Sequence, residues 1–186
     1  MSNIFINKKF FNGKQIIIRQ LSKNDLNKAG DFQKFLNFLV KEDAKISRDS
    51  KISLKQEKLW LKKQVEEIKL EKSVVLIAEY NSKIVGIVNI GLGGDRRQHV
   101  GGLGISIRNS YRGIGIGKYL MEEIIKMVKI QLKPKPKVIQ LSVFASNSPA
   151  INLYKKISFK KVAIIPKVLK YKNKLEDEII MHYQIR

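Results

Sequence analysis

The chain has 186 residues, of which 44% are hydrophobic and 28% are charged, so it is long and apolar enough to fold as one globular domain. It has no cysteine, which excludes a disulfide framework, a cysteine nucleophile and a thiolate metal site. Its two histidines, His99 and His182, are too far apart in the sequence to predict a histidine metal site. We therefore expect no bound metal. Lysine and arginine number 37 against 16 aspartates and glutamates, for a formal net charge of +21.

The positive charge is concentrated in the second half, where the chain from Lys126 to Leu175 has 13 lysines and no acidic residue. Such a field attracts anions, so one interpretation is a phosphorylated cofactor or an acidic partner such as a ribosome or nucleic acid. The other interpretation is a bias in composition without a functional partner. No apolar run approaches the roughly 18–20 residues of a membrane-spanning helix, and residues 1–13, with one short apolar patch at 4–6, lack the order of a signal peptide. We expect a cytoplasmic protein that spans no membrane.

The first half of the chain predicts a strand, two helices and three further strands. The strand covers residues 16–21, and the first helix is capped by Ser22 or Asn24 and has apolar residues at helical spacing as far as Val40. Ser53 and Gln56 form a capping-box pattern that opens the second helix after a polar loop at residues 41–51. The three strands that follow are predicted at residues 73–80, 83–92 and 99–107.

The second half predicts a helix that begins at a glycine-rich turn, has an apolar stripe extending to Ile130, and is ended by Pro134 and Pro136. A strand at residues 138–145 and a short helix at 148–157 follow. Two closing strands at residues 159–165 and 178–185 are predicted to be joined by a lysine-rich loop at 167–174. The order β-α-α-β-β-β-α-β-α-β-β, without an internal repeat or linker, predicts a single mixed α/β (α+β) domain.

The turn between the third of these strands and its helix reads Arg112-Gly-Ile-Gly-Ile-Gly-Lys118, with glycines at 113, 115 and 117. Alternate glycines let the backbone approach a bulky anion, and the first turn of the helix offers unpaired N–H groups. Together they predict a pyrophosphate site to which Arg112 and Lys118 add charge. The spacing does not match a P-loop or the Gly-x-Gly-x-x-Gly fingerprint of dinucleotide-binding proteins.

This turn resembles the acetyl-CoA-binding motif of the GNAT acetyltransferase superfamily, Arg/Gln-x-x-Gly-x-Gly/Ala, at every defined position. A second block also resembles the family, in which a strand is followed by an asparagine and by a short helix ending in Leu-Tyr-x-x-x-Gly-Phe. Its matching residues are Val143, Asn147, Ala150, Leu153-Tyr154-Lys155-Lys156 and Phe159. The usual glycine before Phe159 is Ser158 here.

The resemblance implies a single GNAT-type domain over residues 1–186, with its core at 16–183. It also implies a mixed, mostly antiparallel twisted sheet with helices on both faces and a splayed parallel strand pair. The implied activity is transfer of an acetyl group from acetyl-CoA to a primary amine by direct attack in a ternary complex. The acceptor stays open between a protein N-terminus, a lysine and a small amine, and the protein is expected to be a monomer or a homodimer.

Cofactor contacts are implied for individual residues. The pyrophosphate would lie on the amides of Gly113, Gly115, Gly117 and Lys118, beside Arg112, and the pantetheine arm would follow the strand from Ile105 to Ile107. Asn147 would hydrogen-bond the arm. Tyr154 matches the family's tyrosine near the departing sulfur, where a protonated phenol can act as an acid.

The general base is not evident from the sequence. The position of the glutamate that many N-terminal acetyltransferases carry is Gly104 here, with Ser106 nearby, and His99, Glu79 and Asn89 are candidates that act through water. Two alternatives to the enzyme stay open. One is a non-catalytic basic module that binds RNA or the ribosome, and the other is a CoA-binding sensor on the same fold.

Overall fold

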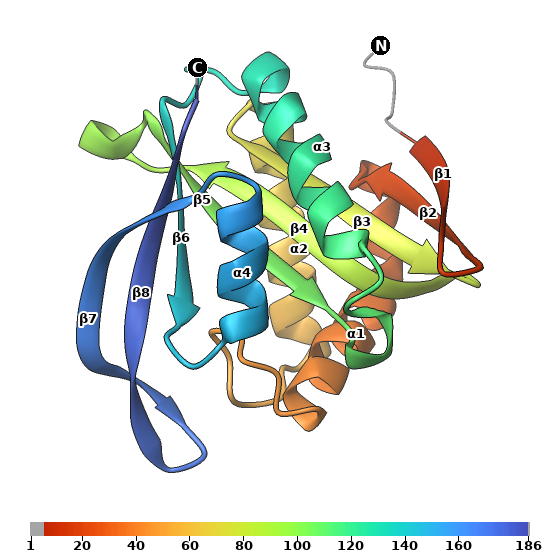
Figure 1. Cartoon of the computed structure of the whole chain (residues 1–186). Helices are drawn as coiled ribbons and strands as arrows, with labels where there is room; N and C mark the ends of the chain where they lie inside the picture. The colour runs from red at the N-terminus through yellow and green to blue at the C-terminus, as the bar shows by residue number, and fades with distance from the viewer. Residues whose placement is uncertain (1–5, 186) are drawn as a thin grey trace.

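The computed structural model describes residues 6–185, which form one eight-stranded sheet with two helices on each face (Figure 1). The strands are β1 (Ile6–Phe11), β2 (Lys14–Gln20), β3 (Ser73–Tyr80), β4 (Lys83–Leu92), β5 (Val100–Ile107), β6 (Val138–Phe144), β7 (Lys160–Tyr171) and β8 (Lys174–Gln184). The helices are α1 (Ala29–Lys41), α2 (Leu54–Lys69), α3 (Ile116–Gln131) and α4 (Ser148–Lys156). Residues 4 and 5 of the N-terminal apolar patch lie outside the described residues.

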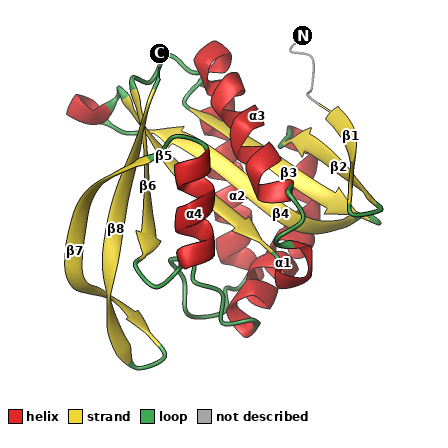
Figure 2. Cartoon of the chain, in the orientation of Figure 1, coloured by secondary structure: helices red, strands yellow, loops and turns green. Residues whose placement is uncertain are grey.

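The sheet order is β1-β2-β3-β4-β5-β6-β8-β7, and every neighbouring pair is antiparallel except β5 and β6 (Figure 2). The parallel pair is held together only from Val100 opposite Val138 to Gly102 opposite Gln140. Beyond that point β6 continues to pair with β8 along its whole length, so the two parallel strands part towards their carboxyl ends. The predicted fold class, including the splayed parallel pair, is confirmed.

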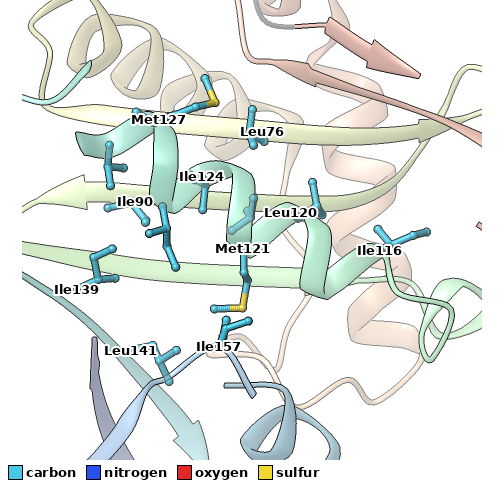
Figure 3. Packing of buried hydrophobic residues seen from close by; sticks show 14 of the residues in the cluster. Leu76, Ile90, Ile116, Leu120, Met121, Ile124, Met127, Ile139, Leu141 and Ile157 are labelled. Atoms are coloured by element: carbon cyan, nitrogen blue, oxygen red, sulfur yellow. The ribbon is translucent and has the colours of Figure 1, made fainter. Parts of the chain in front are cut away.

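Helix α3 packs on one face of the sheet through a stripe of residues four apart. Ile116, Leu120 and Ile124 are fully buried against strand residues such as Leu76 and Ile90, as Figure 3 shows. Burying a side chain of this size stabilises the fold by about 1.5–3 kcal/mol. The predicted stripe ends earlier than expected, because Ile130 is 78% exposed on the last turn.

Helices α1 and α2 cover the other face. Phe32 and Leu39 of α1 and Leu61 of α2 are buried in a cluster with Val75 and Ile77 of β3. Gln64 of α2 accepts a hydrogen bond from the Ser73 hydroxyl at 3.0 Å, which places the middle of α2 beside the beginning of β3. The α2 face of the sheet therefore carries the odd-numbered residues of β3.

Ser53 caps α2 as predicted. Its hydroxyl accepts from the Gln56 amide at 3.3 Å, and its own amide donates to the Gln56 side chain at 2.8 Å. We expect Ser53→Ala to lower the free energy of unfolding by about 1 kcal/mol, because an exposed amide of the first turn loses its acceptor. Urea denaturation measures the change. Ser50→Ala, an exposed serine in the preceding loop, is the control and should change stability by less than about 0.5 kcal/mol.

Three elements differ from the prediction. The first helix was expected to begin after a cap at Ser22 or Asn24, but residues Lys23–Lys28 form a 3-10 helix and α1 begins at Ala29. Strand β1, which pairs with β2 across a turn at Asn12 and Gly13, was not predicted, because Phe11 is its only buried residue. The predicted lysine-rich loop at 167–174 is instead mostly strand, since β7 and β8 continue to a tight turn at Lys172 and Asn173, both with positive φ. Lysine-rich sequence is typical of loops, but the tip of this hairpin is mostly exposed, so its strands need no apolar alternation there.

Candidate functional site

The glycine-rich turn has the backbone geometry of an anion site. Gly113 and Gly115 have φ of 76° and 97°, in the left-handed region that favours glycine, and Gly115 is the N-cap of α3. The first hydrogen bond of the helix runs from the Tyr119 amide to the Gly115 carbonyl at 3.1 Å. The N–H groups of the preceding helical residues, Gly117 and Lys118 among them, therefore have no intrahelical acceptor.

Gly117 also lies where three elements meet. A Cβ atom at this position would be 3.1 Å from Ile107 Cδ1 of β5 and 3.1 Å from Leu153 Cδ2 of α4, which is closer than ordinary van der Waals contact. The absence of a side chain therefore lets the beginning of α3 approach both the end of β5 and α4. The glycine turn of the first motif, the end of β5 and the helix of the second motif therefore meet at this point.

The two cations of the turn have different partners. Arg112 Nε donates to the Ile107 carbonyl at 2.8 Å, and its guanidinium lies 3.7 Å from Glu42, so this side chain ties the end of β5 to α1. Lys118 is 57% exposed and lies 3.8 Å from Glu122 in the same helix. Lys118 is thus the cation of the pair whose side chain can turn towards a bound anion without breaking a link between elements.

The edge of β5 beyond Gly102 has no ladder partner among the described strands, and Ile105 and Ile107 lie on this part of β5. Their side chains pack on the α3 face, half-buried against the main cluster. Backbone groups along this edge are free to bond an extended ligand, in the way that a peptide adds to a sheet edge. The predicted position of a pantetheine arm is therefore available.

Asn147 and Tyr154 lie at the two ends of α4. Asn147 caps the helix, because its Oδ1 accepts from the Ala150 amide at 3.4 Å, which leaves its Nδ2 as a donor. Tyr154 is 7% exposed, and its ring packs at 6.1 Å from that of Phe159. Burial raises the pKa of the Tyr154 phenol to about 12, so it is protonated at neutral pH.

The opposite face of β5 has no side chain at positions 102 and 104, which are glycines. Gly104 of β5 is exposed and lies opposite Asn89 of β4, and a Cβ atom at Gly104 would be 2.9 Å from Asn89 Oδ1. The Asn89 amide therefore occupies the space of the side chain that position 104 lacks. Of the other predicted base candidates, Glu79 is bound by Arg19 at 2.7 Å, and His99 is exposed before the start of β5, away from the splayed end.

The tip of the β7–β8 hairpin joins the α1–α2 loop beside this face. The Tyr171 hydroxyl donates to the Asp43 carbonyl at 2.9 Å, and the Tyr171 ring packs on Phe144 at the end of β6. Lys45 bonds Ser146, which in turn bonds Glu176. These contacts link the loop, the hairpin and the end of β6, and they border the α2 face of the splayed strands.

Glu57, in the first turn of α2, was not predicted as a functional residue, and its carboxyl group is only 5% exposed. Burial raises its pKa from 4.5 to about 7, and the charge of Arg48 opposes this effect. Because α2 is rich in lysine and glutamate, nothing in the sequence distinguishes this glutamate from its solvated neighbours.

The raised pKa makes stability depend on pH. A carboxyl group whose pKa is higher in the folded state favours folding at low pH, and this contribution is lost as the pH rises from about 4.5 through about 7. We expect Glu57→Gln to match the wild type near pH 4 and to be more stable at pH 8 by at most about 3 kcal/mol. Chemical denaturation of both proteins from pH 4 to 8 measures the difference, and a difference that does not vary with pH would contradict the prediction.

Comparison with known proteins identifies the family. Residues 41–159, more than half of the chain, match the acetyltransferase (GNAT) family. The chain belongs to this family. The GNAT resemblance found in the two motifs is thereby confirmed.

Proteins similar to the chain include two curated relatives and a solved structure. It is 32% identical over 112 residues to an N-alpha-acetyltransferase of Sulfurisphaera tokodaii. The aligned residues cover 54% of the chain and 65% of the relative. It is 35% identical over 85 residues to the L-amino acid N-acetyltransferase AaaT of Escherichia coli K12. These residues cover 45% of the chain and 51% of the relative. A GNAT-family acetyltransferase of Streptococcus pneumoniae has a TM-score of 0.80 at 27% identity and covers 91% of this chain and 99% of its own.

Two of the sequence predictions concern absences. Within residues 6–185, no helix has the length and apolar character that crossing a membrane requires. In the same residues, no three His, Cys, Asp or Glu side chains gather as metal ligands. The expected cytoplasmic location and the expected lack of a metal stay predictions.

Proposed function

We propose that this chain is an N-acetyltransferase that moves the acetyl group of acetyl-CoA to a primary amine in a ternary complex. The observation that carries the proposal is the left-handed glycine turn at the start of α3, which lies beside the unpaired edge of β5. This arrangement supplies amides for a pyrophosphate and a strand edge for the extended arm that follows it. Both relatives named above are described as N-acetyltransferases.

In this proposal the pyrophosphate accepts from the amides of Gly113, Gly115, Gly117 and Lys118, and the Lys118 side chain adds charge. Arg112 contributes indirectly, because its bond to Ile107 fixes the end of β5 relative to the turn. The pantetheine arm bonds the backbone of β5 near Ile105 and Ile107. The Asn147 Nδ2 donates to the arm from the other side of the splay, since its Oδ1 already caps α4.

The acceptor amine attacks the thioester carbonyl from the α2 face, where Gly104 leaves the strand uncovered. The amine must lose a proton, and in this proposal water held by the Asn89 amide, which lies beside Gly104, takes it to solvent. A C–N bond forms, the C–S bond breaks, and CoA leaves as a thiolate. A backbone amide of β5 stabilises the oxyanion.

Tyr154 donates a hydrogen bond to the departing sulfur. A phenol with a pKa of about 12 is a weaker acid than an alkyl thiol such as that of cysteine, whose reference pKa is about 8.5, so complete proton transfer is unfavourable. Its contribution is therefore stabilisation of the thiolate by a hydrogen bond in a poorly solvated site. The proton that the thiolate finally takes comes from solvent.

Calorimetry with acetyl-CoA followed by an assay for free thiol tests the proposal. We expect binding with a stoichiometry of one, little weakened by salt, and thiol release with at least one class of primary amine among peptides, polyamines and amino acids. Binding that is lost steeply with salt would instead indicate a basic RNA- or ribosome-binding module. Stoichiometric binding without thiol release from any amine would indicate a CoA sensor.

A further inference from the structure

Arg108 directly follows β5 and lies on the α1 side of the sheet. Its amide donates to the Val85 carbonyl at 2.9 Å, which fixes its backbone to β4. Its guanidinium carbon lies 3.7 Å from the centroid of the Phe38 ring on α1. The stacking shows that the side chain points away from Ile107, which packs on the α3 face, and towards the face of Gly104 and Ser106.

The polar edge of this guanidinium lacks partners. Nε of Arg108 is buried, and no acceptor lies within hydrogen-bonding distance of it among residues 6–185. Glu42 binds the amide of the next residue, Asn109, at 3.1 Å, and its charge is paired with Arg112 at 3.7 Å. No described carboxylate forms an ion pair with Arg108. Because burying an unpaired donor is unfavourable, the side chain is ready to bind an acceptor from a ligand.

A guanidinium that stacks on an aromatic ring with its edge free is the arrangement in which arginine binds a planar carboxylate with two hydrogen bonds. Phe38 limits the motion of the side chain, so less rotamer entropy is lost when a ligand binds. The site therefore suits a carboxylate better than it suits a diffuse polyanion, for which mobile surface lysines suffice.

The position of Arg108 indicates which molecule carries the carboxylate that it binds. Residues two apart on a strand are about 7 Å apart on the same face, so Arg108 lies one such step beyond Ser106 and two beyond Gly104. In the proposed function the acceptor amine reacts beside Gly104, on the face of β5 towards which Arg108 points. The carboxylate of an α-amino acid is close to its amine, so the long arginine side chain has to span most of the separation along β5.

We propose that Arg108 binds the carboxylate of the acceptor, and that the acceptor is a free α-amino acid rather than a protein N-terminus. The inference rests on the proposed function and names its substrate class. In the reaction the amine nitrogen forms a bond to the acetyl carbon, the C–S bond breaks, the ammonium proton passes to solvent, and the carboxylate is unchanged. A peptide has an amide where this carboxylate would be, so it leaves Arg108 unpaired.

The test compares each of the twenty L-amino acids with its primary amide, by thiol release at saturating acetyl-CoA. For the amino acids that react, we expect kcat/KM to exceed that of the amide by about 30-fold or more, as charged hydrogen bonds contribute. The α-amine of an amino acid amide is less basic than the α-amine of the free amino acid. A larger fraction of the amide is therefore neutral and reactive, which works against the expected preference for the acid. Comparable values for acid and amide, or turnover of peptides alone, would overturn the inference.

Variants of Arg108 distinguish a role in binding the carboxylate from a role in the stability of the fold. Arg108→Gln should lower kcat/KM for the acid about 10–100-fold, mainly through KM, and leave the amide unchanged. Arg108→Lys should retain only part of the preference, because lysine lacks the fork of donors. Arg97→Gln, which removes an exposed arginine bonded to Gln140, is the control and should leave both substrates unchanged.

The other outcomes are distinguishable. If Arg108→Gln weakens acetyl-CoA binding and the acid-to-amide ratio does not change, Arg108 serves the cofactor and the inference is wrong. If Arg108→Gln fails to fold, the ratio in the wild type and in Arg108→Lys still decides. If no amine releases thiol and acetyl-CoA does not bind, it is the proposed function that fails.

Discussion

Replacing Gly115 by valine is expected to weaken acetyl-CoA binding by at least about 100-fold. The residue has φ of 97°, and a β-branched side chain is rarely found in that region, so the backbone at the N-cap of α3 must move. The new side chain also points at Phe11, whose ring lies 3.6 Å from the position of a Cβ atom. Movement of the turn takes several amides out of position together, and each charge-assisted bond contributes about 1.5–3 kcal/mol. Calorimetry with acetyl-CoA measures the loss.

Strain alone would also lower stability, so a control with the same strain is needed. Gly13, in the β1–β2 turn, has φ of 73° and no atom within 4 Å of a Cβ position. We expect Gly13→Val to lower the melting temperature about as much as Gly115→Val and to leave acetyl-CoA binding unchanged. If both variants bind acetyl-CoA like the wild type, the turn is not the pyrophosphate site.

The parts of the fold that could be predicted are those in which local chemistry and burial agree. The Ser53 capping box, the apolar stripe of α3 and the apolar strand β3 each have a pattern that only one element satisfies. Strand β1 escaped prediction because its lysines and its single buried residue, Phe11, give no alternation. The β7–β8 hairpin was underestimated for the same reason, since β7 and the tip of the hairpin are mostly exposed and have no apolar pattern.

The candidate site divides along the same line. The role of its glycines could be predicted, because few other residues tolerate a positive φ or leave room for a close approach to the backbone. The partners of its charged side chains could not. Glu42, which binds Arg112, is far away in the sequence, and the stacking of Arg108 on Phe38 depends on how α1 packs. The burial of Glu57 is likewise a property of the assembled helices.

Replacing Tyr154 by phenylalanine is expected to lower kcat by about 10- to 100-fold while the KM for acetyl-CoA changes little. The hydroxyl group is proposed to act only when the sulfur acquires charge, so its loss affects the transition state more than the bound substrates. The reduction lies at the low end for a positioned donor, because a thiolate is already a good leaving group and the phenol, with a pKa of about 12, does not give up its proton. Steady-state kinetics at varied acetyl-CoA separates kcat from KM.

Tyr183→Phe is the matched control for this prediction. Tyr183 packs on the same Phe159 ring as Tyr154, at 5.5 Å, but it comes from β8, so its replacement removes a hydroxyl from the same aromatic cluster without touching α4. We expect this variant to retain the kcat of the wild type. If Tyr154→Phe also retains full kcat at saturating substrates, the ring serves packing alone and the thiolate leaves without a donor. In that case the catalytic assignment is wrong, while the cofactor site at Gly113, Gly115 and Gly117 stands, because its amides do not depend on the phenol.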